Sequence, residues 1–545
     1  MQHFDRFFES RQHDRKGKGC SVSLGVTSYD QWQAWRQNGG FTTLPYLHTI
    51  AASLPGHRLA DWLGAWQAAS PYAIILESGK TGRYTYLGLR PAEVLRGKDG
   101  RAERLDPIDG TVRESLHGAP LEVVRAWHSR RRSPRLEGAP PLLGGSAGYW
   151  SYDVVRAIES LPVQAQDDLR VPDYLFLQLD ELWIIDHERD LLHCAVHTHL
   201  EPDAPGGDTL RASYDEAAQR AQEMARLWRE LCRVAGDGAG AAADRRRREQ
   251  MRADDLQINV EDMTGIRSPF SKRDFEAAVL RIQDYIAQGD VFQVNLSLRQ
   301  SRELLASSEE LYEWLRLINP SPYMGMLRCP DFQLVSASPE LLVLAREGRL
   351  AARPIAGTRR RGRTEAEDAA LAEELRTNEK ERAEHIMLVD LERNDLGRIA
   401  AYGSVRVDEL MIIERYSHVM HLVSQVEARL AAGKDAFDVV AATFPGGTIT
   451  GAPKIRTMEI IEELEPVRRG PYTGSMGWID YNGDMEFNII IRTMTVKDGS
   501  VHIQAGAGIV IDSDPEREYY ESLNKAKALW KAIEYSERTA GTAAR

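Results

Sequence analysis

Residues 381–398 have the sequence ERAEHIMLVDLERNDLGR, which begins with two acidic residues, Glu381 and Glu384, three positions apart. A second stretch, EREYYESLNKA at 516–526, repeats this spacing with Glu518 and Glu521. Residues three apart share a helix face, so each pair presents two carboxylates together. One such pair is usually a solvated helix face, whereas four carboxylates from two helices would form a hard-oxygen site for Mg²⁺.

Both acidic stretches lie in a region where segments with helical periodicity alternate with β-like segments. Apolar residues recur at helical spacing over 271–288, and Ser271 with Asp274 provides a helix start. The further helical segments are expected at 366–396, 435–443 and 515–535. The β-like segments are expected at 292–298, 333–336, 474–479, 488–496 and 501–511.

The preceding half of the chain has a different composition. Residues 46–235 mix short apolar runs with turn clusters, which predicts sheets with few helices. GDGAGAAA at 236–243 is small and flexible, and the four arginines of 245–248 are expected to form a solvated surface. We therefore expect an N-terminal extension at 1–45, a domain at 46–235, a linker at 236–268, a second domain at 269–537 and a tail at 538–545.

Composition excludes several classes of partner. The chain has 545 residues, is 43% hydrophobic and carries a net charge of −12, so it has no overall positive field for nucleic acid. No apolar run approaches the roughly 18 residues of a membrane span, and residues 1–25 contain no hydrophobic signal core. We expect a cytoplasmic enzyme that contacts neither nucleic acid nor membrane.

Two glycine-rich segments lie among the expected strands and helices. In QAGAGIV at 504–510 the glycines either relieve a strand or let backbone N–H groups approach a carboxylate. In FPGGTITGAPK at 444–454 a helix-start turn and an anion site are equally compatible with the sequence.

These segments, together with NPSPYM at 319–324, SPELL at 338–342 and RPIAGT at 353–358, resemble the chorismate-binding enzymes over about 271–535. Residues 46–235, including ILES at 75–78, look like the N-terminal domain of component I of anthranilate and aminodeoxychorismate synthases. The resemblance implies an α+β fold in which large β-sheets pack as a sandwich with surrounding helices.

The same resemblance implies ligands for the metal and the substrate. Glu384 and Glu521 would coordinate Mg²⁺, which holds the ring carboxylate of chorismate, and Glu381 and Glu518 would complete the acidic shell. The implied substrate-binding residues are Gly357, Thr358, Thr448, Tyr472, Arg492, Gly506, Ala507, Gly508 and Lys525. Arg492 suits this role because its planar guanidinium can bind a carboxylate through two parallel hydrogen bonds.

Four residues are implied to act in catalysis: Glu340, His421, Gln293 and Lys454. Glu340 would donate a proton to the departing C4 hydroxyl, which requires a raised pKa. His421 in HVMHLVS would contact the same hydroxyl. Gln293 matches the position of a water-activating lysine in isochorismate-forming relatives, and because glutamine cannot act as a base, ammonia is the expected nucleophile.

The product is harder to predict than the family. Ala356 stands where some aminodeoxychorismate synthases carry a nucleophilic lysine. Anthranilate synthases have alanine there, and so does the Gram-positive type of aminodeoxychorismate synthase component I, which the chain as a whole resembles. QVNLS at 293–297 and FPGGTITGAPK look like the aminodeoxychorismate branch, so amination at C4 is our expectation. Amination at C2 to give anthranilate is the alternative, and a non-catalytic scaffold subunit is a third possibility.

Two further partners are implied. None of the four cysteines lies in a recognisable amidase pattern, so ammonia is expected from a separate glutamine amidotransferase subunit. The ILES and NPSPYM segments match the tryptophan-binding region of the family. They imply a pocket at Ser78, Pro320, Tyr323 and Met324 that either binds tryptophan or is only core structure.

Overall fold

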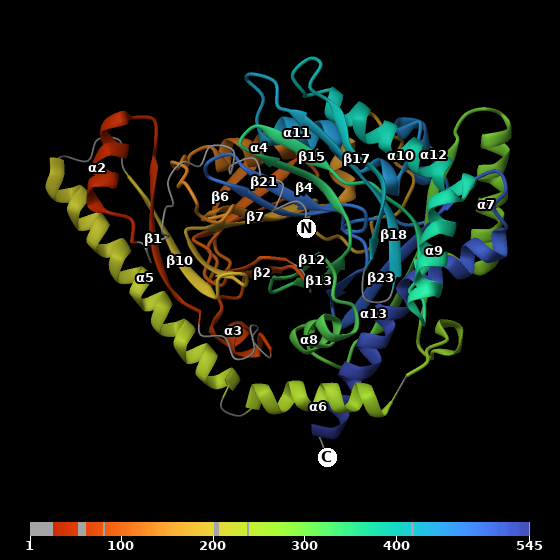
Figure 1. The fold of residues 1–545 in the computed structure, drawn as a ribbon, viewed down its shortest axis with the longest axis horizontal. Coiled ribbons are helices and arrows are strands. Elements are labelled where there is room, and N and C mark those ends of the chain that lie inside the picture. The colour runs from red at the N-terminus through yellow and green to blue at the C-terminus, as the bar shows by residue number, and fades with distance from the viewer. Residues whose placement is uncertain are drawn as a thin grey trace.

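The fold is built on two large antiparallel β-sheets (Figure 1). The computed structural model describes residues 26–52, 61–79, 82–200, 206–236, 239–254, 256–415 and 419–543. Residues 1–25 of the predicted N-terminal extension therefore lie outside the described part of the chain. In that part the α+β prediction is confirmed, because both sheets carry helices on their outer faces.

The first sheet contains strands from both halves of the chain. In spatial order it consists of β1 (Thr43–Ala51), β10 (Leu191–His199), β9 (Glu181–Asp186), β3 (Tyr84–Gly88), β2 (Ala73–Glu77), β12 (Tyr323–Arg328), β13 (Phe332–Ser338), β22 (Thr493–Lys497), β23 (Ser500–Ile509), β11 (Gln293–Glu303) and β19 (Gly451–Ala452).

The second sheet is similarly mixed. Its order is β16 (Ile355–Arg360), β18 (Val419–Arg429), β15 (Arg349–Ala352), β14 (Leu341–Arg346), β21 (Met485–Asn488), β20 (Ser475–Asp480), β7 (Gly145–Trp150), β8 (Tyr174–Leu179), β4 (Glu93–Lys98), β5 (Arg101–Leu105) and β6 (Val112–His117). Strand β17 (Arg406–Arg415) also pairs with β18.

Both sheets join the two predicted domains directly. In the first sheet β2 pairs with β12, where Ile75 lies opposite Met326. In the second sheet β7 pairs with β20, where Gly148 lies opposite Gly477. The segments 46–235 and 269–537 thus share both sheets, and the boundaries between them stay a prediction.

The inner faces of the sheets pack against each other and the outer faces pack against helices. Ile74 and Leu334 of the first sheet share one buried cluster with Leu177 of the second. The helices are α2 (Tyr29–Asn38), α3 (Leu63–Ala68), α4 (Pro120–His128), α5 (Gly206–Gly236), α6 (Ala239–Ala253), α7 (Lys272–Ala287), α8 (Ser308–Ile318), α9 (Glu365–Thr377), α10 (Glu379–Gly397), α11 (Ala436–Thr443), α12 (Lys454–Leu464) and α13 (Pro515–Ala543). Three short 3-10 helices are η2 (Tyr152–Ala157), η3 (Val260–Asp262) and η4 (Gly447–Ile449). This arrangement confirms the sandwich with surrounding helices.

The predicted helix at 366–396 is wrong as a single element. It is divided at Asn378, which is extended and serves both as the C-cap of α9 and as the N-cap of α10. The Asn378 side chain accepts a hydrogen bond from the backbone N–H of Glu381 at 3.0 Å, a normal N-cap interaction. This cap fixes where α10 begins and therefore where its acidic pair faces.

The predicted strand at 488–496 is also divided. Strand β21 ends at Asn488 and β22 begins at Thr493, because Arg492 has a left-handed backbone with φ +50°. Left-handed backbone is uncommon for a residue with a side chain and is concentrated at functional sites. The break separates Arg492 from the regular ladder.

The segment 236–268, expected as a linker, contains helix α6. Arg247 was expected on a solvated surface, but only 3% of it is exposed. Its guanidinium forms an ion pair with Glu310 at 2.6 Å and lies 3.6 Å from Asp61. The expectation of a solvated surface is therefore wrong for Arg247, since α6 packs this residue between two carboxylates.

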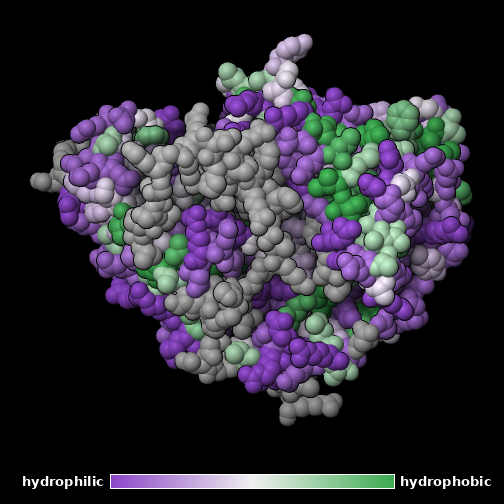
Figure 2. Space-filling model, viewed as in Figure 1, coloured by the Kyte–Doolittle hydropathy of each residue, from purple (hydrophilic) through white to green (hydrophobic). Residues whose placement is uncertain are grey.

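The visible surface is mostly hydrophilic, with hydrophobic residues concentrated toward the side where α9, α10 and α12 lie (Figure 2). None of the helices in the described residues combines the length and the apolar character needed to cross a bilayer.

Candidate active site

A cavity of about 770 Å³ collects most of the residues that the sequence singled out. Its walls come from β11 and β23 of the first sheet, β16 and β18 of the second, and helices α10, α13 and η4. Helices α10 and α13 lie on the same side of the molecule as β18 and β23 (Figure 1). The cavity therefore lies where one end of each sheet meets the two acidic helices.

The acidic pair of α10 lies in the cavity wall. Glu381 forms an ion pair with Arg359 at 2.9 Å, and Glu384 accepts a hydrogen bond from the Gln293 amide at 3.3 Å. Burial raises the pKa of Glu384, the Glu381 carboxylate raises it further, and the Gln293 hydrogen bond partly opposes both effects. A positive ion beside this pair would relieve that repulsion.

The acidic pair of α13 faces the same cavity. Glu518 accepts a hydrogen bond from the Ser513 hydroxyl at 2.7 Å, and Glu521 forms an ion pair with Lys525 at 2.9 Å. Burial raises the pKa of Glu518, the Ser513 hydrogen bond opposes this, and the neighbouring Glu521 raises it again. Both helices thus bring partly desolvated carboxylates to one space, as their spacing predicted.

The donor chemistry of these four glutamates fits Mg²⁺, which prefers oxygen ligands and tolerates bound water. The four carboxylates do not converge on a single point. In the described residues no three acidic, histidine or cysteine side chains are close enough together to hold a metal ion. The glutamates would have to turn from their present partners toward an ion to coordinate it.

Glu340 lies in the same cavity, between β13 and β14. Only 7% of the residue is exposed, and burial raises the pKa of its carboxyl to about 7. The Thr448 hydroxyl and the positive charges of Arg492 and Lys525 oppose this rise. Near neutral pH a large fraction of Glu340 is therefore protonated and able to donate, as the acid role requires.

Arg492 provides a positive charge without a carboxylate partner. None of the ion pairs in the described residues involves Arg492. Burial lowers the pKa of its guanidinium and the nearby Glu340 carboxylate opposes that shift. Because a buried guanidinium is unfavourable without a counter-charge, this side chain is suited to bind an anion that enters the cavity.

His421 of β18 contacts the β-bulge in β16. Its Nδ1 lies 3.3 Å from the Gly357 carbonyl oxygen and 3.0 Å from the Thr358 hydroxyl. A carbonyl can only accept, so the proton of the neutral imidazole belongs on Nδ1, leaving Nε2 as an acceptor. Burial lowers the pKa of His421, which favours this neutral form.

Gly357 has a specific reason to lack a side chain. Its φ is +59°, and a Cβ atom there would lie 2.7 Å from Leu375 and 2.8 Å from the Glu381 carboxylate. The glycine therefore lets β16 approach α9 and α10 closely. Tyr472, also in the cavity wall, is buried beside Arg469, and burial raises the pKa of its phenol so that it stays neutral.

Two of the predicted site residues do not line the cavity. Ala507 is fully buried on the opposite face of β23, because successive strand residues alternate faces and Gly506 and Gly508 occupy the cavity side. Lys454, the first residue of α12, forms an ion pair with Asp395 behind the wall. The other implied catalytic, substrate-binding and metal-binding residues all line the cavity.

The structure adds wall residues that the motifs did not single out. Asn295 and Gln504 lie on the cavity face of β11 and β23, and Asn319, Arg359 and Lys380 join them. Asn295 is two positions after Gln293, so strand alternation could have identified it. Gln504 lies on the adjacent strand, two positions before Gly506, so the same alternation could have identified it.

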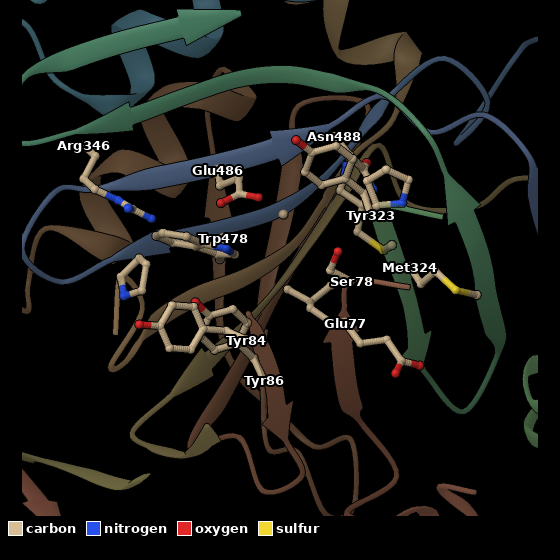
Figure 3. A pocket seen from close by; sticks show the side chains of 15 residues that line it. Glu77, Ser78, Tyr84, Tyr86, Tyr323, Met324, Arg346, Trp478, Glu486 and Asn488 are labelled. Carbon is tan, nitrogen blue, oxygen red and sulfur yellow. The ribbon is translucent and has the colours of Figure 1, made fainter. Parts of the chain in front are cut away.

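A second, smaller pocket contains most of the residues implied for tryptophan. Its volume is about 70 Å³, and Ser78, Tyr323 and Met324 line it, whereas Pro320 does not. Figure 3 shows these three along one side and Trp478 with Tyr84 on the other. Tryptophan binding stays a prediction.

A family model described as chorismate binding enzyme matches residues 72–531. The chain is 46% identical over 465 residues to aminodeoxychorismate synthase component 1 of Bacillus subtilis, covering 85% of this chain and 92% of that protein. It is also 46% identical over 503 residues to anthranilate synthase component 1 of Thermus thermophilus, covering 90% and 98% respectively.

Solved structures agree on the fold. The crystal structure of anthranilate synthase component I from Streptococcus pneumoniae matches with a TM-score of 0.65 at 33% identity, covering 83% of this chain and 93% of that one. The menaquinone-specific isochorismate synthase from Escherichia coli shares the fold with a TM-score of 0.59 at 16% identity, covering 93% and 98%. By the extent of the match and by its cavity, the chain belongs to the family of chorismate-binding enzymes.

Proposed function

We propose that this chain is the component I subunit of an aminodeoxychorismate synthase, which replaces the C4 hydroxyl of chorismate with an amine. The observation that carries the proposal is one cavity holding a buried acid with a raised pKa, Glu340, together with Arg492, which forms no ion pair with a carboxylate in the described residues. An anionic substrate that must lose a hydroxyl needs both groups.

The reaction requires one bond to break and one to form. The C4–O bond breaks and the oxygen leaves as water with a proton from Glu340, while the nitrogen of ammonia forms a bond to the ring. The attacking nitrogen then loses a proton, which can restore Glu340. Arg492 binds a carboxylate of the substrate, and the neutral His421 contacts the C4 hydroxyl.

Magnesium, held by Glu384 and Glu521 with Glu381 and Glu518 nearby, would supply positive charge to bind the ring carboxylate. The raised pKa values of Glu384 and Glu518 support this assignment, because burial raises each of them and a neighbouring carboxylate adds to the rise.

The choice of C4 rests on QVNLS, whose Gln293 and Asn295 both line the cavity. Ala356 favours the alternative, amination at C2 with release of pyruvate to give anthranilate, because it also lines the cavity and offers no amine. The two relatives do not separate these products, since each is 46% identical to the chain. A scaffold without turnover is disfavoured by the intact set of acid, arginine and carboxylates.

Ammonia would come from a separate glutamine amidotransferase subunit, which the component 1 names of the relatives support. A cytoplasmic location stays a prediction. Glutamine alone should not act as a nitrogen source for this chain, whereas ammonium salts should.

Product analysis tests the proposal. Purified protein with chorismate, Mg²⁺ and ammonium should consume chorismate and form aminodeoxychorismate without stoichiometric pyruvate. Joint accumulation of pyruvate and fluorescent anthranilate, with no lyase added, would replace the C4 assignment with the C2 assignment. No consumption of chorismate would favour the scaffold.

A further inference from the structure

Three amide side chains form a row along one wall of the large cavity. Gln293 and Asn295 project from β11, and Gln504 projects from β23, with Gly506 and Gly508 between them on the same face. A Cβ atom on Gly508 would lie 2.1 Å from the Gln293 amide nitrogen, and one on Gly506 would lie 2.9 Å from the Asn295 side-chain oxygen. The two glycines therefore leave the space in which the amides lie.

The orientation of two of these amides follows from their partners. The nitrogen of Gln293 faces Glu384, and the ionised carboxylate can only accept, so Gln293 must donate and its oxygen faces elsewhere. The nitrogen of Gln504 lies 2.9 Å from the Ser297 hydroxyl.

The Ser297 hydroxyl has one proton, and it donates that proton to another group. This hydroxyl lies 2.8 Å from Glu465, a carboxylate that also forms an ion pair with Arg469 at 2.7 Å. Ser297 must donate to Glu465 and can only accept from Gln504. The Gln504 oxygen is thereby turned away from Ser297.

All three amide oxygens are buried and lack a donor in the part of the chain that the structure describes. Leaving a buried acceptor unpaired costs about 1–3 kcal/mol, so a ligand that supplies N–H or O–H groups would be favoured here. The carboxylates of chorismate are acceptors and its C4 hydroxyl carries a single proton, so chorismate alone cannot satisfy three acceptor oxygens. A cation such as Mg²⁺ would prefer the ionised glutamates in the same cavity.

We propose that Gln293, Asn295 and Gln504 form a binding strip for ammonia inside the substrate cavity. Ammonia donates its N–H groups to the amide oxygens, and its lone pair then faces the cavity, where the electrophilic carbon lies. The proposal rests on ammonia being the nucleophile, but it holds for attack at either C4 or C2.

The test uses variants that keep side-chain size and remove the acceptor. In Asn295→Leu and Gln504→Met, the KM for ammonium should rise at least fivefold, while the KM for chorismate and the kcat at saturating ammonium stay within twofold. Asn295→Asp keeps acceptor oxygens and should keep a low KM for ammonium. Gln300→Met is the matched control, because Gln300 is an amide on the same strand whose oxygen already accepts from Trp530 at 3.1 Å.

The outcomes separate the inference from the proposed function. An unchanged ammonium KM in folded Asn295→Leu and Gln504→Met would overturn the strip while amination stands. Parallel rises in the KM values for ammonium and chorismate would also overturn it, since the amides would then bind the larger substrate. A wild-type protein without ammonium-dependent turnover would overturn both proposals together.

Discussion

Replacing Glu340 with glutamine should stabilise the protein at pH 8 while it removes the acid from the cavity. Burial raises the pKa of this carboxyl from 4.5 to about 7. Below about pH 4.5 the carboxyl is protonated in the folded and unfolded states, so it has no effect on stability. Above pH 7 the folded state carries a buried charge, which costs about 3 kcal/mol for a shift of this size.

Glutamine has nearly the same shape and does not titrate. The free energy of unfolding of Glu340→Gln, relative to wild type, should therefore increase by about 3 kcal/mol between pH 5 and pH 8. At about 2.1 cal/mol/K per residue for the unfolding entropy, this corresponds to a gain of about 3 °C in relative Tm for a chain of this length.

The assay is the difference in Tm between variant and wild type at the two pH values. Taking the difference cancels titrations shared by both proteins. Glu249→Gln, on an exposed position of α6, is the control and should give no pH-dependent difference. A Tm difference for Glu340→Gln that is equal at pH 5 and pH 8 would refute a buried carboxyl with a raised pKa, and the acid role would lose its physical basis.

Three further outcomes are expected. Glu384→Gln or Glu521→Gln should abolish Mg²⁺-dependent turnover and leave thermal unfolding nearly unchanged; near-normal activity in either variant would overturn the metal assignment. Arg247→Met should lower stability by about 3–5 kcal/mol, measured as a drop in Tm, because it leaves two carboxylates without their buried partner. Gly508→Ala should slow ammonium-dependent turnover by at least tenfold. The new Cβ would lie 2.1 Å from the present position of the Gln293 amide nitrogen, so this side chain would have to move. Unchanged initial rates would show that this amide position is not required.

The elements that follow from local pattern were the predictable part of the fold. The helix expected at 271–288 is α7 (Lys272–Ala287), because its apolar spacing and its Ser271 cap are both local signals. Sheet order was not predictable in the same way. The pairing of β2 with β12 joins residues about 250 positions apart, and only the packed structure determines that neighbour.

The candidate site was also predictable only where local sequence patterns determine the position of a residue. The spacing of the acidic pairs correctly brought four carboxylates from two helices to one cavity. Lys454 does not line the cavity, because a lysine at a helix start can point to a ligand or to a buried partner such as Asp395, and its catalytic role stays a prediction. Ala507 was implied through the backbone of the 506–508 segment, and that role stays a prediction, while strand alternation places its side chain on the other face.

The cavity concentrates groups whose burial is unfavourable in the free protein. Glu340 has a raised pKa, Arg492 has a lowered pKa, and the amide oxygens of the strip have no donors in the described residues. Each of these costs would be relieved by a different part of the proposed reaction: an acceptor oxygen for Glu340, a carboxylate for Arg492 and N–H groups for the amides. The apolar clusters beside the cavity contain none of these groups. Their persistence at one place is therefore better explained by ligand binding than by folding, and bound chorismate with ammonia should stabilise the protein more than either does alone.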